Sequence, residues 1–339
     1  MSEVRYFKEA RNGRNYDKFS YNVLEHLDKK FGGLESLAVK LHFGEKNSET
    51  HLDPELVEEI YNKLNEVVSD LVLIDCNVLY KSERSKGSSH IRLAKENGFN
   101  FGKIEIADGE KGEDEWIREV NLNHFDRVKL GASLKKYDGI LSIAHFTGHE
   151  VTGFGAALKN MGMGLGSKSG KLEMHNAFNL EIERSECKGC GECIEECPAD
   201  AIDIQEDKAY LNEEKCIGCG KCIAVCPNEA IKIPWDDATP VQLQERICEY
   251  AYGADKDKET YFINVLNSIT PGCDCVDQEQ EKATDDLGVL YSDDIVSIDQ
   301  ASLDLVGKNN LDKKLNPERQ VEYAEEIGLG ERNYNLKEI

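Results

Sequence analysis

The chain has 339 residues, of which 40% are hydrophobic and 31% are charged, and its formal net charge is −24 at pH 7. This length allows two or three domains, and the acidic balance argues against nucleic acid and anionic membrane surfaces, which bind through an excess of Lys and Arg. No apolar run reaches the ~18 residues that span a membrane, and the charged N-terminus contains no signal-peptide core. We therefore expect a cytoplasmic protein whose thiols stay reduced.

The first half of the chain alternates short apolar runs with amphipathic segments. After an N-terminal strand, the pattern predicts a helix at residues 21–29, strands at 37–43, 71–75, 103–107 and 139–144, and helices at 53–68 and 90–97. Asp53 can cap the second helix with Pro54 in its first turn, and Gly98 can end the third. This strand–helix alternation is typical of an α/β domain with a mostly parallel sheet.

Two cysteine runs in the middle of the chain repeat at an offset of 29 residues. Each run has the spacing C-x-x-C-x-x-C-x-x-x-C-P, which is typical of the bacterial two-cluster ferredoxin module. In that module three cysteines of a run hold one cluster, and the fourth ligates the other cluster. We therefore assign one [4Fe-4S] cluster to Cys187, Cys190, Cys193 and Cys226, and the second to Cys216, Cys219, Cys222 and Cys197.

Other functions of these cysteines agree less well with the pattern. A disulfide framework requires an oxidising compartment, and a zinc site uses two Cys-x-x-Cys pairs without the third cysteine of each run. Glycines between the ligands, such as Gly189 and Gly218, allow positive φ and bring backbone N–H groups close to the sulfurs. The runs therefore predict an α+β module that carries single electrons.

The strand–helix alternation resumes after the cysteine runs. A helix is expected at residues 239–252, strands at 260–265 and 287–290, and a helix at 294–305. Two strands are too few for a well-buried sheet, which favours insertion of the module into one α/β domain over two separate flanking domains. We expect the α/β domain in residues 1–183 and 235–310, the inserted ferredoxin module in 184–234, and a polar C-terminal tail in 311–339, with one helix at 317–327.

A glycine-rich loop precedes the first cysteine run. Residues 143–175 read IAHFTGHEVTGFGAALKNMGMGLGSKSGKLEMH and follow a strand end, where open α/β sheets bind ligands. Glycines let a backbone approach a ligand closely, and free N–H groups near Lys168 and Lys171 suit a phosphate. The candidates for cofactor binding are Gly153, Gly155, Lys159, Gly162 and Gly164. The catalytic candidates are His149, Lys159 and His175, and for each histidine the alternative is a hydrogen-bonded structural role.

A third cysteine feature, Cys273-Asp274-Cys275, follows a Pro-Gly turn. Two cysteines at this spacing need further ligands to form a metal site, and the candidates are Cys76, Cys248 and the loop histidines. Thiolates favour a soft metal such as zinc, nickel, copper(I) or iron. A strained disulfide and a pair of reduced thiols are the alternatives.

Most of the chain, about residues 37–305, resembles a family of prokaryotic iron–sulfur centre proteins built on a domain of unknown function. The matching features are the stretch GHEVTGFGAALKNMGMG, the two cysteine runs, and the later segments TPGCDC and DDIVSIDQASLDL. The resemblance implies an α/β domain with an inserted two-cluster ferredoxin module, and it implies no particular activity.

The glycine-rich loop alone is similar to the cofactor site of nickel-pincer lactate racemases. In those enzymes a lysine carries the pincer nucleotide between two histidines, and here His149 precedes Lys159 by ten residues while His175 follows it by sixteen. Ser89-His90-Ile-Arg92 is similar to the racemase segment that supplies a catalytic histidine, although a structural role is favoured for His90. The racemase phosphate-binding signature is missing from residues 60–90, and racemases have no ferredoxin insert.

Three functions therefore stay open. The first is an iron–sulfur redox protein that passes single electrons to or from a ligand or metal site in the α/β domain. The second is a metallo-enzyme with a nickel-pincer-like cofactor at the His149–Lys159–His175 loop, and the third is a non-enzymatic electron carrier or docking protein. The expected partners are a redox protein and a small molecule in the crevice of the sheet. Only residues 176–186 separate His175 from Cys187, so we expect the clusters to exchange electrons with whatever the loop binds.

Overall fold

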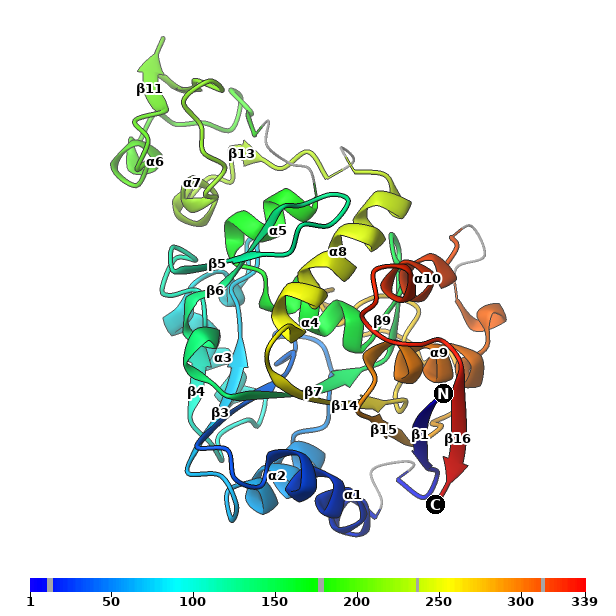
Figure 1. Ribbon diagram of the computed structural model, residues 1–339. Helices are drawn as coiled ribbons and strands as arrows, with labels where there is room; N and C mark the ends of the chain where they lie inside the picture. The colour runs from blue at the N-terminus through cyan, green and yellow to red at the C-terminus, as the bar shows by residue number, and fades with distance from the viewer. Residues whose placement is uncertain (11–14, 176–179, 236–237, 312–314) are drawn as a thin grey trace.

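An eight-stranded sheet runs through the part of the chain that the computed structural model describes, residues 1–10, 15–175, 180–235, 238–311 and 315–339 (Figure 1). Its strand order is β16-β1-β15-β14-β7-β2-β3-β4. The strands are β1 (Ser2–Phe7), β2 (Ser36–Lys40), β3 (Asp70–Asp75), β4 (Ile104–Ile106), β7 (Gly139–His145), β14 (Glu259–Val265), β15 (Val289–Ser292) and β16 (Tyr334–Glu338). From β14 to β4 all neighbours are parallel, whereas β15 is antiparallel to β14 and β1. The predicted α/β class with a mostly parallel sheet is therefore confirmed.

Strands from both sides of the cysteine runs belong to this one sheet. Strand β7 pairs with β14 along its whole length, from Gly139 beside Glu259 to His145 beside Val265. The second part of the chain supplies β14 and β15, which extend the sheet that the first part begins. The cysteine-rich segment, residues 184–234, is therefore flanked by two parts of the same sheet.

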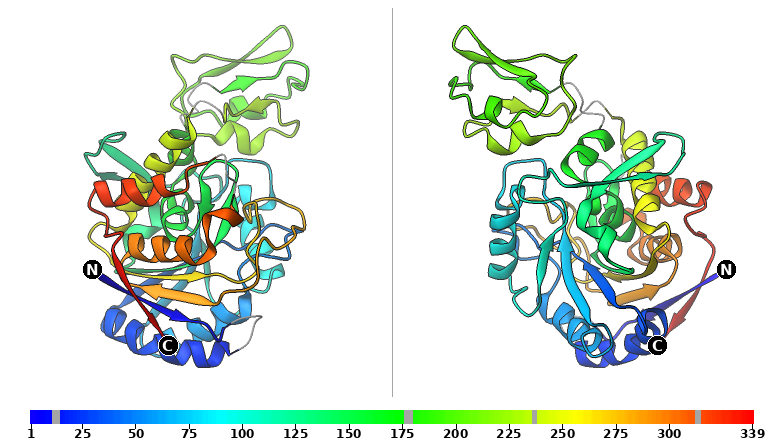
Figure 2. Two further views of the ribbon diagram at one scale, coloured as in Figure 1. Left: turned by 90° about the vertical axis from the view of Figure 1, so that its right-hand side faces the viewer. Right: turned by 60° about the vertical axis from the view of Figure 1, so that its left-hand side comes forward.

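Helices cover both faces of the sheet (Figures 1 and 2). One face carries α1 (Tyr16–Phe31) and α2 (Pro54–Leu64), and the other carries α4 (Ala157–Leu165), α8 (Pro240–Asp255), α9 (Ile295–Val306) and α10 (Glu318–Glu326). The alternation of side chains along a strand supplies both cores, because Leu71 and Leu73 of β3 join the first and Val72 and Ile74 join the second. Helix α3 (Gly87–Glu96) packs near β4 at the edge.

Helices α4 and α8 cross at backbone contact. A Cβ atom on Gly162 would lie 2.1 Å from the carbonyl oxygen of Ile247 in α8. Because that oxygen belongs to the backbone, only glycine permits this approach. The crossing holds α4, and with it Lys159, against the sheet.

The C-terminal tail forms part of the α/β domain. Helix α10 falls within the range expected for it and packs against α8, and β16 pairs in parallel with β1 at the sheet edge. The sequence does not predict β16, because its residues are mostly polar. Pairing at a sheet edge depends on backbone hydrogen bonds and needs no apolar pattern. The sequence also did not predict the hairpin of β5 (Glu115–Glu119) and β6 (Arg127–Gly131).

The cysteine-rich segment projects from the domain beside α5 (Lys168–Met174) (Figures 1 and 2). Its short elements are β10 (Glu181–Ile182) paired with β13 (Ile231–Lys232), β11 (Ile202–Gln205) paired with β12 (Lys208–Leu211), and the helices α6 (Glu192–Glu195) and α7 (Lys221–Val225). Leu79 and Leu172 of the α/β domain share an apolar cluster with its buried cysteines, and Lys81 pairs with Glu229 at 2.6 Å. Within the described ranges, no helix is both long and apolar enough to cross a membrane.

Candidate metal centre

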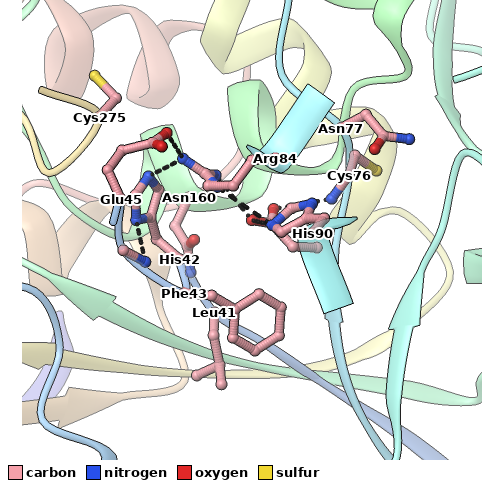
Figure 3. Close-up of polar contacts among 12 residues, drawn as sticks. Leu41, His42, Phe43, Glu45, Cys76, Asn77, Arg84, His90, Asn160 and Cys275 are labelled. Atoms are coloured by element: carbon pink, nitrogen blue, oxygen red, sulfur yellow. Dashed lines mark hydrogen bonds and ion pairs between the residues drawn. The ribbon is translucent and has the colours of Figure 1, made fainter. Parts of the chain in front are cut away.

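A buried network of charges lies where β2 and β3 end (Figure 3). Asp75, the last residue of β3, is 3.1 Å from Lys40 Nζ and 3.0 Å from Arg84 Nη2, and all three side chains are at most 3% exposed. Glu45 accepts a second hydrogen bond from Arg84 at 3.0 Å. The charges of Lys40 and Arg84 are thus balanced by those of Asp75 and Glu45 in the buried interior. Such pairing offsets the free-energy cost of removing charged groups from water.

Two histidines complete this network around Arg84. His42 lies 2.7 Å from Arg84 Nη1, and His90 Nε2 accepts from Arg84 Nε at 3.2 Å. Burial and the Arg84 charge lower the pKa of both imidazoles, that of His90 to about 3, so both rings are neutral. His90 is fully buried with its ring edge-on to Phe43, which agrees with the structural role favoured for it.

No pattern in the sequence predicts this network. Its one available signal is Lys40, a charged residue inside the apolar strand run LAVKLHF. A lysine at such a position needs a buried partner, but the partner comes from β3 and from the 3-10 turn that contains Arg84. Only the folded sheet brings these segments together.

The glycine-rich loop forms a short hairpin that leads into α4. Strand β8 (Thr147–His149) pairs with β9 (Gly153–Gly155), and α4 begins two residues later. Alanine at the N-cap has no polar side chain, so the Asp299 carboxylate of α9 accepts the N–H groups of Ala157 and Leu158 at 3.0 and 2.8 Å. This contact from a distant helix sets the start of α4 and the position of Lys159.

The three catalytic candidates lie close together. Lys159 Nζ donates to Cys273 Sγ at 3.2 Å. Burial, followed by the Lys159 charge, lowers the pKa of His149 and that of His175, the latter to about 4. The next residue of α4, Asn160, accepts from Lys40 Nζ at 2.7 Å and so joins this group to the charge network.

The loop between β14 and β15 brings Cys273 and Cys275 to His149. Their sulfur atoms and one ring nitrogen of His149 all lie within 4.8 Å of one another. His145 anchors the residue between the cysteines, because its Nδ1 lies 2.7 Å from Asp274 Oδ2 and its Nε2 lies 2.7 Å from the Asn267 carbonyl. Burial alone would lower the pKa of His145, but the Asp274 carboxylate raises it above its ordinary value, so the contact is an ion pair.

The two other cysteines considered as ligands are used elsewhere. The Cys76 thiol lies 3.5 Å from the Leu165 carbonyl, and the Cys248 thiol donates to the Gln320 carbonyl at 3.1 Å. Cys248 is fully buried on α8, as expected of a small apolar side chain. Within the described residues, a histidine of the loop therefore accompanies the Cys-x-Cys pair.

The loop lysines and glycines have defined contacts. Lys168 donates to the Ser85 carbonyl and Lys171 to the Gly166 carbonyl, each at 2.6 Å. Gly162 serves the helix crossing, and a Cβ on Gly164 would lie 2.6 Å from Lys40 Nζ. Hydrogen bonding thus explains the two lysines, and close packing explains the two glycines.

Gly153 and Gly155 line the β8–β9 hairpin next to Lys159. Gly153 has a φ of +81°, which disfavours any side chain. A Cβ on Gly155 would lie 3.1 Å from Lys159 Cδ, so glycine leaves room for the lysine side chain. Both glycines therefore shape the space around Lys159.

A cleft of about 380 Å³ opens at the carboxyl ends of β7 and β14. It is lined by Tyr16, His51, Leu52, Asp53, His145, Val265, Asn267, Ser268, Lys282 and Asp286. His145 thus contacts the cleft as well as Asp274 of the Cys-x-Cys loop. The volume falls in the range of small-molecule sites, and the location is the expected one for an open α/β sheet.

The cysteine-rich segment contains a small pocket of its own. Cys187, Cys190, Cys193 and Cys226 are among the residues that line it. Burial and the neighbouring thiol of Cys226 raise the pKa of Cys193 to about 11. The fourth cysteine of the second run therefore lies beside the first three of the first run.

The remaining four cysteines form a corresponding group. Burial and the neighbouring thiols of Cys219 and Cys216, followed by those of Cys193 and Cys197, raise the pKa of Cys222. Burial raises the pKa of Cys219 as well, and the thiols of Cys197 and Cys216 add to this. Backbone N–H groups donate to the sulfurs, from Ala201 to Cys197 at 3.2 Å and from Ala230 to Cys226 at 3.3 Å. The expected positive φ of the intervening glycines is confirmed at Gly189, Gly191, Gly218 and Gly220.

The structure describes part of the stretch between the glycine-rich loop, which ends at His175, and the cysteine-rich segment. Residues 176–179 of the 176–186 stretch lie outside the described residues. The ring of His175 meets that of Trp235, which directly follows the cysteine-rich segment, with centroids 4.8 Å apart. One aromatic contact thus joins the end of the segment to the histidine beside Lys159.

Several solved structures are similar to this chain, and two of them show the extent of the similarity. The lactate racemase apoprotein from Thermoanaerobacterium thermosaccharolyticum is 11% identical over 91% of this chain and 57% of that one, with a TM-score of 0.47. A protein from Thermotoga maritima is 12% identical over 87% of this chain and 59% of that one, also with a TM-score of 0.47. The chain thus spans less than two thirds of either protein, and similarity at this level carries no argument about function.

No curated protein matches the chain. One family model does, over residues 37–304, and its description is a domain of unknown function, DUF362. This range agrees with the resemblance stated from the sequence and includes the loop, the cysteine-rich segment and the Cys-x-Cys pair. The chain therefore belongs to the DUF362 family.

Proposed function

We propose that this chain is an iron–sulfur redox protein that binds two [4Fe-4S] clusters and transfers single electrons to or from a site in its α/β domain. The observation that supports this most directly is the pocket lined by Cys187, Cys190, Cys193 and Cys226. Three of these thiols come from the first run and one from the second, which is the cross-ligation of a two-cluster module. A zinc site or a disulfide would not require this exchange between the runs.

The surroundings of the sulfurs suit clusters that change oxidation state. Backbone N–H groups near cluster sulfurs stabilise the additional negative charge of the reduced form and so help to set the potential. The segment also docks on the α/β domain through Leu79, Leu172 and the Lys81–Glu229 pair. The His175–Trp235 contact supports an exchange of electrons with the site around Lys159.

Paired substitutions test the cluster assignment. Cys187→Ala with Cys226→Ala should remove one cluster and leave about four of about eight irons per chain, because both residues belong to the same cluster. Cys187→Ala with Cys197→Ala should remove both clusters. Iron and sulfide content of anaerobically purified protein, with the EPR spectrum after dithionite reduction, measures the result.

Cys248→Ala is the matched control and should retain about eight irons, since this thiol lies on α8 and donates to the Gln320 carbonyl of α10. If Cys187→Ala with Cys197→Ala retains about four irons and Cys187→Ala with Cys226→Ala retains none, each run holds its own cluster and the cross-ligation is wrong. Iron-free wild-type protein from anaerobic native cells contradicts the function itself.

His149 lies within 4.8 Å of the Cys273 sulfur to which Lys159 donates, and the Lys159 charge adds to burial in lowering the pKa of His149 and of His175. This grouping favours a second candidate, a metallo-enzyme with a pincer-like cofactor on that lysine. Protein from the native host should then give a Lys159 peptide heavier than its sequence mass, together with nickel in elemental analysis. Lys171, on the next helix, is the internal control and should be unmodified. An unmodified Lys159 peptide would exclude a covalently attached cofactor.

A further inference from the structure

Three ligating side chains outside the cysteine runs converge in the α/β domain. We propose that His149, Cys273 and Cys275 bind one thiophilic divalent ion of the zinc type and leave its fourth position open. Their ligand atoms already lie within 4.8 Å of one another. The ligands of a tetrahedral zinc ion lie about 3.3–3.8 Å apart, so closure around an ion needs movements of about 1 Å.

Hydrogen bonds hold the histidine in place for this role. Its Nδ1 accepts the backbone N–H groups of Val151 and Thr152, both at 3.1 Å, which fixes the ring and leaves Nε2 for the ion. An ion at Nε2 takes the place of the proton that this nitrogen carries in the neutral ring. Gly148, next to His149, also donates to the Thr270 carbonyl at 2.8 Å and so connects β8 to the cysteine loop.

The cysteine loop is anchored on its other side. The ion pair between His145 and Asp274 fixes the residue between Cys273 and Cys275. The backbone of β8 at Gly148 and the His145 side chain of β7 therefore both hold the cysteine loop, and together they determine the positions of all three ligands. A preformed donor set of this kind binds an ion without ordering a flexible loop first.

The donor atoms and charges decide the class of ion. One imidazole nitrogen and two sulfurs favour zinc-like ions over magnesium or calcium, which prefer oxygen. Two thiolates neutralise a divalent ion, and Lys159 Nζ, 3.2 Å from Cys273 Sγ, adds an N–H···S hydrogen bond. Cys275 and Lys159 are partly exposed, so a small ligand can reach the open position, as at catalytic zinc sites with three protein ligands.

This inference rests on the proposed function and deepens it by naming an ion that holds the electron-exchanging ligand at its open position in the α/β domain, because an ion of the zinc type does not itself change oxidation state. The three ligands are separate from the eight cysteines of the runs, so ion binding and cluster binding can fail independently. If the clusters are absent but the ion still binds, the ion site stands and the redox function falls.

Cobalt(II) is the direct probe of this site. Anaerobically purified, cluster-loaded protein that has been depleted of other divalent metals should bind about one Co²⁺ and show the ligand-field bands of tetrahedral thiolate cobalt at the red end of the spectrum. These bands lie beyond the main cluster absorption, and added Zn²⁺ should abolish them. Cys273→Ser, Cys275→Ser and His149→Ala should each weaken Co²⁺ binding by at least about 100-fold, because loss of a ligand exceeds the 10–100-fold effect of an outer-shell change.

Two control variants distinguish a specific loss of Co²⁺ binding from a general loss of folded structure. Cys248→Ser removes a buried thiol elsewhere and should bind Co²⁺ as wild type does. Cys275→His supplies a different ligand at the same position and should retain binding with shifted bands. Iron content and far-UV circular dichroism should be unchanged in all variants.

Two outcomes would overturn the inference. In the first, the cobalt bands persist in Cys273→Ser, Cys275→Ser and His149→Ala alike, so that the ion lies elsewhere. In the second, the wild-type protein binds no Co²⁺, and mild oxidation yields a peptide with a Cys273–Cys275 disulfide. The second result would identify the pair as a redox-active dithiol.

Discussion

Asp75→Asn is expected to lower the free energy of unfolding by about 3–5 kcal/mol, the range for removing one partner of a buried ion pair. Asp75 is 2% exposed and contacts the equally buried Lys40 and Arg84. Asparagine preserves the shape of the side chain but removes the charge, so the network keeps two cations against Glu45 alone. Urea unfolding followed by circular dichroism measures the loss.

Asp70→Asn, at the other end of β3, is the matched control. Asp70 is more than half exposed and lies 3.7 Å from Lys103, so its loss should change stability by less than about 1 kcal/mol. Equal effects of the two substitutions would show that burial of the network is unimportant for stability.

The dependence on pH distinguishes charge from packing at Asp75. Burial acts to raise the pKa of this carboxyl, but the charges of Lys40 and Arg84 outweigh it and hold the pKa well below its usual range. The stability that this group contributes is therefore complete above the unfolded-state pKa of about 3.9 and is lost as the pH falls toward the lower folded value. The difference between wild type and Asp75→Asn should be constant at neutral pH and shrink below about pH 4. A difference that stays constant in acid would indicate a packing effect.

Gly148→Ala is expected to weaken Co²⁺ binding by about 10–100-fold, as other changes outside the ligand shell of a metal do. A Cβ on Gly148 would lie 2.1 Å from the backbone oxygen of Pro271, two residues before Cys273. The strand that carries His149 and the loop that carries the cysteines must then separate. Overpacking of this kind should also lower the free energy of unfolding by about 1–3 kcal/mol.

Gly272→Ala provides the control in the same loop. Its Cβ would meet the end of the Gln280 side chain, at 2.6 Å, and no backbone atom. That side chain accepts from the Gly272 N–H and donates to the Cys273 carbonyl, so its displacement disturbs two hydrogen bonds but does not separate the loop from β8. Cobalt affinity should therefore fall by less than about tenfold, which is the lower end of the range expected for Gly148→Ala. If Gly148→Ala binds cobalt as tightly as Gly272→Ala, contact between β8 and the loop does not position the ligands.

Most helices and parallel strands of the core could be predicted because each is encoded locally. Helices α4 and α5 are the exception, since their many glycines indicate a loop over residues 143–175. Asp53 caps α2 through the Glu55 N–H with Pro54 in the first turn, as its sequence indicates. Apolar runs such as Leu71–Asp75 are bounded by polar residues and fall within a few residues of the observed strands. The edge strand β16 is not predicted, because backbone pairing at an exposed edge leaves no apolar pattern. The hairpin of β5 and β6 is not predicted either, although Val128 and Leu130 alternate in β6 and are fully buried.

The candidate site was only partly accessible from the sequence. The sequence groups His149, Lys159 and His175 because they share one glycine-rich loop. It indicates Cys273 and Cys275 because they are two residues apart. The sequence does not decide which side chain accompanies the cysteines, because Cys76, Cys248 and the loop histidines are all candidates. Lys40, Asp75 and Arg84 were not grouped at all, since each belongs to a different segment.

The sequence by itself determined the α/β class and the order of most core elements, and its cysteine spacing predicts two clusters. These properties depend on residues within about one turn or one strand of each other, so periodicity and spacing record them. Only the tertiary structure decided which side chains meet at the carboxyl ends of β2, β3, β7 and β14. Parallel strands bring residues more than a hundred positions apart to one sheet edge, as Lys159 and Cys273 show, and no local pattern encodes that distance.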